Sequence, residues 1–378
     1  MTGIAKSFDS LVAICNQVLL SEDKPTRSFL LSHSSAEEWD NLFSLAAKHG
    51  MLPTVISFLE TKKIEDDSLR KVIIKWYAVA QNFKKEYQKR VLTMRELSMM
   101  FAEDGLDIMF FKGAVLAQLY PYPEWRVFSD IDFYLYGKCV EGNKVLARHG
   151  IESRPYYHHN TEATLHGILL ENHYDFVERL NHRQNLVLDD ELKKLADEEG
   201  KSISATFLGD DIRNAYVMTP TMNAIFLMRH MSAHFVSESI PLRMLYDWAL
   251  FLKHHSKEVD WKRVERLYKA SGMIEFVGII QGLLQKFFSV SFPECPVKPL
   301  MGEKMERVWH SIMCPPVSNP YKKQNIAYFL YETKVFIKNR WKHQIVYPSE
   351  SYLLLFIRYT WSVLKKKQKQ RDISLASA

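Results

Sequence analysis

The sequence contains few cysteines and no long apolar run. Its four cysteines, Cys15, Cys139, Cys295 and Cys314, lie far apart and form no Cys-x-x-Cys pair. This spacing argues against a zinc site or a disulfide framework and fits a reducing compartment, so we predict a cytoplasmic protein. No segment reaches the roughly 18 uncharged apolar residues that a membrane span needs. The apolar run Leu11–Leu20 also lacks the cleavage site of a signal peptide.

A strong charge of either sign is absent as well. The 378 residues include 50 Lys and Arg against 44 Asp and Glu, which gives a net charge of +6. This mild excess permits a polyanionic partner such as a nucleotide, RNA or an anionic lipid, but it requires none of them. The composition, with 47% hydrophobic and 25% charged residues, is that of a globular chain long enough for two or three domains.

Helical patterns occupy both ends of the chain. Ser35–Glu38 has the spacing of a capping box. A stripe of apolar residues from about 67 to 104, without Pro or Gly, predicts one long helix that Gly105 ends. We predict an N-terminal helical region at 1–105, a central core at 106–218, a helical bundle at 219–290, and a loop-rich and helical extension with a basic tail at 291–378.

The central part has the patterns of strands joined by helices. We expect an α+β protein with an α/β core, in which a small mixed sheet is flanked by helical regions. The expected strands are 106–111, 129–136, 152–158, 165–177 and a hairpin of 204–208 with 212–218. The expected later helices are 114–120, 140–149, 221–236, 241–255, 262–270, 273–288, 323–341 and 350–365, with loops over 291–321.

The strand after Ser129 carries the clearest chemical signal. Alternation puts Asp130 and Asp132 on one face and the apolar residues between them on the other. Two neighbouring carboxylates repel each other and resist burial. A solvated strand face could carry such a pair, but a cation bound between them is the interpretation that the upstream residues favour.

Those upstream residues are suited to binding phosphate. Lys112 and Gly113 form the expected turn from a strand into a helix, where a glycine lets backbone N–H groups approach an anion. Lys112 and Arg126 supply positive charge, and Ser129 directly precedes the carboxylates. Carboxylates for a metal beside a phosphate cradle are the equipment of phosphoryl transfer.

The order Lys112-Gly113, Arg126, then Ser129-Asp130-Ile131-Asp132 resembles the DNA polymerase beta-like nucleotidyltransferase superfamily, in particular a bacterial group known only as nucleotidyltransferases. The resemblance covers about residues 36–290. It implies a Mg²⁺-dependent enzyme, with two ions, that transfers a nucleoside monophosphate from a nucleoside triphosphate to a hydroxyl of an unidentified acceptor. Asp130 and Asp132 would be metal ligands, and Lys112, Gly113, Arg126 and Ser129 would contact phosphate.

The resemblance also implies a third carboxylate on a neighbouring strand, which binds metal and accepts the proton of the acceptor. Glu171 is the preferred candidate because an acidic residue two positions before a histidine, here His173, is typical of the group. Asp175 is the reserve candidate, since alternation places all three side chains on one face. A polar strand facing solvent is the alternative.

Two pairs of residues on the later helices are spaced by one turn. His230 and His234 have the spacing of metal ligands, but a contact to the acceptor or base, or simple packing, also fits. The same contact to the acceptor or base is considered for His173 and Arg243. Arg243 and Asp247 fit either an intrahelical ion pair or a contact in the site.

Two further classes of function suit the same residues. A degenerate module would bind nucleotide without turnover, and a toxin-like enzyme would modify tRNA or protein. Aromatic and basic residues at 352–371 are typical of a solvated terminal helix, and they would also suit RNA or the surface of a membrane.

Overall fold

The computed structural model describes residues 2–20, 35–59, 67–155, 159–179, 182–237, 239–314 and 326–358. They form an α+β protein with one mixed sheet, as predicted. Among these residues, no helix combines the length and the apolar character needed to cross a membrane. The basic tail and the predicted helix beyond 358 lie outside the described residues, as do 156–158 of one predicted strand.

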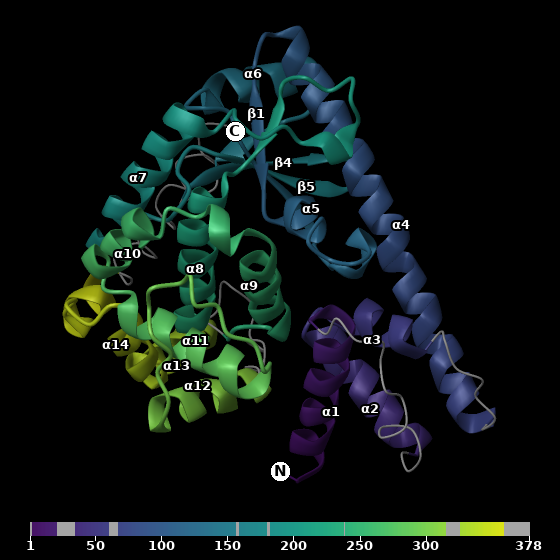
Figure 1. Ribbon diagram of the computed structural model, residues 1–378. Coiled ribbons are helices and arrows are strands. Elements are labelled where there is room, and N and C mark those ends of the chain that lie inside the picture. The colour runs from purple at the N-terminus through teal and green to yellow at the C-terminus, as the bar shows by residue number, and fades with distance from the viewer. Residues whose placement is uncertain are drawn as a thin grey trace.

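The N-terminal helices are α1 (Thr2–Leu19), α2 (Ala36–Lys48), α3 (Leu52–Leu59) and α4 (Asp67–Glu103). The capping box is confirmed: Ser35 Oγ accepts from the Glu38 backbone, and the Glu38 carboxylate accepts from the Ser35 backbone. The single long helix is confirmed as α4, which runs from the sheet down to α2 and α3 (Figure 1).

The sheet has six strands in the order β3-β4-β5-β2-β1-β6. Strand β2 lies at its centre, antiparallel to β1 and parallel to β5. Strand β6 extends the sheet parallel to β1, and β4 pairs antiparallel with β5 and β3. The strands are β1 (Ile108–Phe111), β2 (Asp130–Tyr134), β3 (Arg154–Pro155), β4 (Asn160–Leu165), β5 (Ile168–His173) and β6 (Ala215–Val217).

Two strand predictions need correction. The strand expected at 165–177 is confirmed only over 168–173, as β5, and β4 before it was not predicted; His166 and Gly167 turn the chain between them with φ of 53° and 74°. The hairpin expected from 204–208 and 212–218 is reduced to one bridge between Ser204 and Tyr216. Residues 206–208 form a short 3-10 turn, and β6 pairs with β1 instead.

The remaining helices surround the sheet or form the bundle at lower left in Figure 1. The remaining helices are α5 (Gly113–Ala117), α6 (Cys139–Arg148), α7 (Arg183–Glu199), α8 (Pro220–Ser237), α9 (Leu242–His255), α10 (Trp261–Ala270), α11 (Ile274–Phe287), α12 (Glu303–Met313), α13 (Ile326–Lys338) and α14 (Arg340–Val346).

The prediction of loops throughout 291–321 is wrong over 303–313, where α12 buries Met305, Val308 and Trp309.

The two faces of the sheet belong to different cores. Ile108 and Phe110 of β1 pack with α4 and α6 on one face. Met109 and Phe111 point to the other face, where they join α7, α8 and the helical bundle. Because the period of a strand is two, Asp132 lies on this second face, opposite Ile131 and Phe133. The carboxylates therefore face the bundle.

Candidate active site

The turn after β1 places a lysine over the carboxylates of β2. Lys112 has φ of +56°, which is rare for a residue with a side chain, and Gly113 follows with φ of +25°. A Cβ on Gly113 would lie 3.0 Å from the ring of Phe128, so the ring would have to shift by a few tenths of an ångström to admit it. In this conformation Lys112 Nζ donates to Asp132 Oδ1 at 2.6 Å.

The side chains of Asp132, Glu171 and His173, from two adjacent strands, lie close together. The parallel register sets Asp132 opposite Glu171. His173 Nε2 lies 3.1 Å from Asp132 Oδ1 and 3.4 Å from Glu171 Oε2. One potential ligand atom from each of Asp132, Glu171 and His173 falls within 4.8 Å of the others, as metal ligands do. The preferred third carboxylate therefore lies beside Asp132, as predicted.

Asp132 is buried, and within the described part of the chain only one of its two carboxylate oxygens has hydrogen-bond partners. Its Oδ1 accepts from both Lys112 and His173, whereas its Oδ2 is buried and has no hydrogen-bond partner among the described residues. Burial alone would raise the pKa of Asp132, but the Lys112 charge and the His173 hydrogen bond outweigh it and hold that pKa well below its usual range. A buried, ionised carboxylate with an unused oxygen is suited to a further cation.

His173 faces acceptors on both sides. Its Nδ1 lies 3.2 Å from the Asp175 backbone oxygen, and its Nε2 faces Asp132. Burial opposes protonation, but the hydrogen bonds to Asp132 and Glu171 raise the pKa of His173. A ring protonated at both nitrogens would donate to both of these acceptors.

Asp130 lies one strand period from Asp132 but does not join the same cluster. It is half-buried, and burial together with the Asp132 charge raises the pKa of the Asp130 carboxyl. It lines a cavity of about 240 Å³ with Lys112, Gly113 and Ser129. The two carboxylates share a face, as predicted, but they have different environments.

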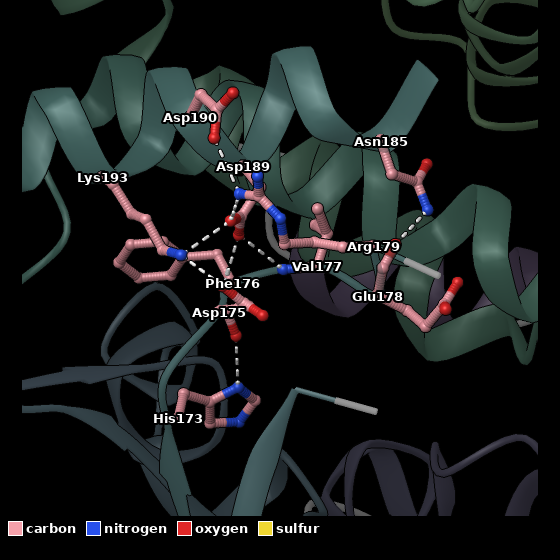
Figure 2. Close-up of polar contacts among 10 residues, drawn as sticks. All are labelled: His173, Asp175, Phe176, Val177, Glu178, Arg179, Asn185, Asp189, Asp190 and Lys193. Carbon is pink, nitrogen blue, oxygen red and sulfur yellow. Dashed lines mark hydrogen bonds and ion pairs between the residues drawn. The ribbon is translucent and has the colours of Figure 1, made fainter. Parts of the chain in front are cut away.

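The reserve carboxylate, Asp175, points away from this cluster. It lies beyond the end of β5, and its carboxylate pairs with Lys193 of α7 (Figure 2). Asp189 anchors the same segment by accepting from the backbone N–H groups of Phe176 and Val177. The expected common face is lost because the strand ends at His173.

Arg126 is held by a carboxylate from the helical bundle. Its Nε and Nη2 donate to the two oxygens of Asp247 at 2.7 and 2.9 Å, and its Nη1 donates to the Gly113 backbone at 2.8 Å. Tyr120 donates to the same carboxylate at 3.0 Å. The pair therefore ties α9 to the Lys112-Gly113 turn, and the ion pair considered between Arg243 and Asp247 does not form.

The far wall of the cavity belongs to α8 and α9. His230, His234, Arg243, Asp247 and Trp248 line it. Burial, Lys112 and Arg243 lower the pKa of His234 to about 4, and burial holds that of His230 well below its ordinary value. Their rings contact each other at 4.7 Å, but neither belongs to a cluster of three metal ligands among the described residues. Both histidines thus line the cavity, and both rings are neutral.

Some residues that contact the site were not predicted to do so. Tyr120 was expected only to end a helix, and Asp247 lies one turn from Arg243, which suggested that arginine as its partner. Asp189 lies in the charged stretch 178–202, for which the sequence predicts only a helix and a linker. Covariation between distant positions in related sequences would identify such contacts.

Comparison with known families defines the class of protein. Residues 35–289, more than half of the chain, match the family described as uncharacterised nucleotidyltransferase, and the chain belongs to this family. No curated protein matches it. A solved structure, that of a tRNA nucleotidyltransferase complexed with a primer tRNA and an incoming ATP analog, shares 16% identity over 75% of this chain and 87% of that chain, with a TM-score of 0.21.

Proposed function

We propose that this protein is a Mg²⁺-dependent enzyme that transfers a nucleoside monophosphate from a nucleoside triphosphate to a hydroxyl of an acceptor. Membership of a nucleotidyltransferase family supports the reaction class. The observation that carries the metal dependence is Asp132 Oδ2, which is buried without a partner beside Glu171. Carboxylate oxygens are the protein ligands that Mg²⁺ prefers.

The residues around Asp132 fit such an ion. Lys112 and His173 occupy only Oδ1, so Oδ2 of Asp132, the Glu171 carboxylate and the Asp130 carboxylate would hold it. We infer that His173, whose Nε2 lies 3.1 Å from Asp132 Oδ1, orients that carboxylate. Bound Mg²⁺ would neutralise charge on the phosphates and template the displacement.

Different residues would act on the acceptor hydroxyl and on the leaving group. The Glu171 carboxylate accepts the proton of the acceptor hydroxyl, whose oxygen forms a bond to the α-phosphorus. The bond from that phosphorus to the bridging oxygen breaks, and pyrophosphate leaves with the electron pair. The negative charge of the departing pyrophosphate would be stabilised by the residues that line the cavity beside Asp130, namely Lys112, the Gly113 backbone, Arg126 and Ser129.

One observation favours a second candidate, a nucleotide-binding module without turnover. Lys112 Nζ and His173 already place positive charge on Asp132, so the site is partly neutralised without a metal. Such a module would bind nucleotide through Lys112 and the Gly113 turn independently of Mg²⁺.

Binding and pyrophosphate release, measured together, separate the two candidates. The wild type would be titrated with each common nucleoside triphosphate with and without Mg²⁺, and release would be followed with mixtures of sugar, peptide and RNA acceptors. For an enzyme, Asp132→Asn abolishes Mg²⁺-dependent binding, and Glu171→Gln lowers release by about 10²–10⁴-fold. Glu103→Gln, an exposed position on α4, is the matched control. Nucleotide binding that ignores Mg²⁺ and both substitutions would support the module and contradict the enzyme.

A further inference from the structure

Arg243 is a cation at the cavity without an acidic partner. It occupies the second position of α9, and its Nη1 donates to the Val127 backbone at 2.6 Å. Among the described residues no carboxylate lies within ion-pair distance of it. Asp247, one turn further on, is taken by Arg126 through both of its oxygens.

A guanidinium in this position needs an anion. Arg243 has five N–H donors, and one of them donates to the Val127 backbone oxygen. Burial and the nearby Arg126 charge lower the pKa of Arg243, which shows that its surroundings oppose its charge. Arg243 is half-buried, and the cavity is the space in which a partner for its charge would lie.

A second unpaired donor lines the same cavity. Trp248 is fully buried, and its indole Nε1–H has no hydrogen-bond partner among the described residues. Buried indole N–H groups ordinarily find an acceptor. Arg243 and Trp248 lie on α9, five residues apart, and the α8 imidazoles His230 and His234 line the cavity beside them.

Lys112 and Asp247 also line the cavity, but each is already paired, Lys112 with Asp132 and Asp247 with Arg126. The unpaired groups of the two walls therefore have opposite chemistry. Asp130, on β2, offers a carboxylate next to the cluster of Asp132, whereas α9 offers a guanidinium and an indole N–H. An elongated polyanion that carries a metal ion at one end is complementary to both walls. A monophosphate bound at the carboxylates would reach only one of them.

We propose that Arg243 and Trp248 form a subsite for the terminal phosphates of a nucleoside triphosphate. The inference rests on the proposed function, which leaves this wall of the cavity unassigned. Charge on the terminal phosphates satisfies Arg243, so the subsite selects triphosphates over monophosphates. Because Arg243 belongs to α9 and Lys112 to the turn after β1, the same phosphates contact the bundle and the sheet together.

The test compares polyphosphate with monophosphate binding. Arg243→Gln and Arg243→Lys would be titrated by calorimetry, in Mg²⁺, with inorganic tripolyphosphate, the four ribonucleoside triphosphates and their monophosphates. Arg266→Gln, an exposed position on α10, is the control. We expect Arg243→Gln to weaken triphosphate and tripolyphosphate binding by about tenfold or more, with less than a twofold change for the monophosphates.

The Lys variant keeps the test decisive if Arg243→Gln does not fold. It keeps the charge but loses the planar fork, so tripolyphosphate binding should weaken several-fold while monophosphate binding is unchanged. A purely structural role at Val127 would weaken all ligands equally, and that result, or no change, would overturn the subsite while leaving the proposed function intact. Arg243-dependent tripolyphosphate binding without pyrophosphate release would support the subsite and contradict the transferase. A wild type that binds none of these probes would overturn both.

Discussion

Lys112 Nζ lies 2.6 Å from Asp132 Oδ1, and both side chains are withdrawn from solvent. The protein thus supplies its own counter-charge to the carboxylate that the proposed metal would bind through its other oxygen. This arrangement keeps Asp132 ionised in the absence of metal, so the ion would find its ligand already deprotonated.

Removing the lysine should destabilise the metal-free protein and increase its response to Mg²⁺. Lys112→Met leaves Asp132 buried with a weaker counter-charge, and breaking a buried pair costs about 3–5 kcal/mol. Mg²⁺ should then raise the unfolding midpoint of the variant more than that of the wild type, because the ion replaces the missing charge. Thermal unfolding with and without Mg²⁺ measures this. Lys85→Met, on the exposed side of α4, should behave as the wild type.

The contact between Arg126 and Asp247 should couple the sheet to the bundle. A double-mutant cycle with Arg126→Met and Asp247→Leu tests it by urea unfolding. Each single substitution leaves a buried charge and should cost about 3–5 kcal/mol, whereas the double variant should lose clearly less than the sum. Losses that simply add would show that the bidentate contact contributes no pairwise energy.

Stability should rise with pH between about 4 and 6.5, in part because of His49. The Leu242 backbone donates to His49 Nδ1 at 3.1 Å, which requires a neutral ring, and burial lowers the pKa of His49 to about 4. In this window the unfolded chain binds the proton and the folded chain does not, so acid favours unfolding. His49→Asn keeps an acceptor without a titrating group. It should reduce the slope of unfolding free energy near pH 5 by about 1.4 kcal/mol per pH unit. An unchanged slope would contradict the neutral ring.

Gly113 should be required for phosphate as well as for folding. Its φ is +25°, and an added Cβ would meet Phe128 at 3.0 Å, so Gly113→Ala should displace the turn that carries Lys112. We expect weaker tripolyphosphate binding and a loss of about 1–3 kcal/mol in stability. Gly150→Ala has φ of +74° but open space around the Cβ, so it should lower stability and leave binding unchanged. Equal binding losses in the two variants would contradict a local role of the turn.

Local patterns predicted the chemical centre of the site well. Alternation alone placed Asp130 and Asp132 on one face of a strand, and the glycine after Lys112 marked the turn that delivers the lysine to them. These features are set within a few residues, where periodicity and backbone preference decide the structure. The resemblance added Glu171, which the parallel register of β2 and β5 brings opposite Asp132.

Pairings across long separations could not be predicted in the same way. Arg126 and Asp247 are 121 residues apart, and within the sequence Asp247 stood one turn from another arginine. The β4–β5 hairpin was missed because its turn requires a positive φ at His166, and a histidine at that position does not predict one. Prolines on both sides of α12 obscured an amphipathic helix that its burial against the bundle stabilises.

A crystal structure with Mg²⁺ and a non-hydrolysable nucleoside triphosphate would show whether Asp132 binds the ion. We expect an ion bonded to Asp132 Oδ2 and Glu171, with the triphosphate between Lys112 and α9. Nucleotide bound elsewhere, or an ion that leaves Asp132 Oδ2 without a partner at saturating Mg²⁺, would contradict the proposed site.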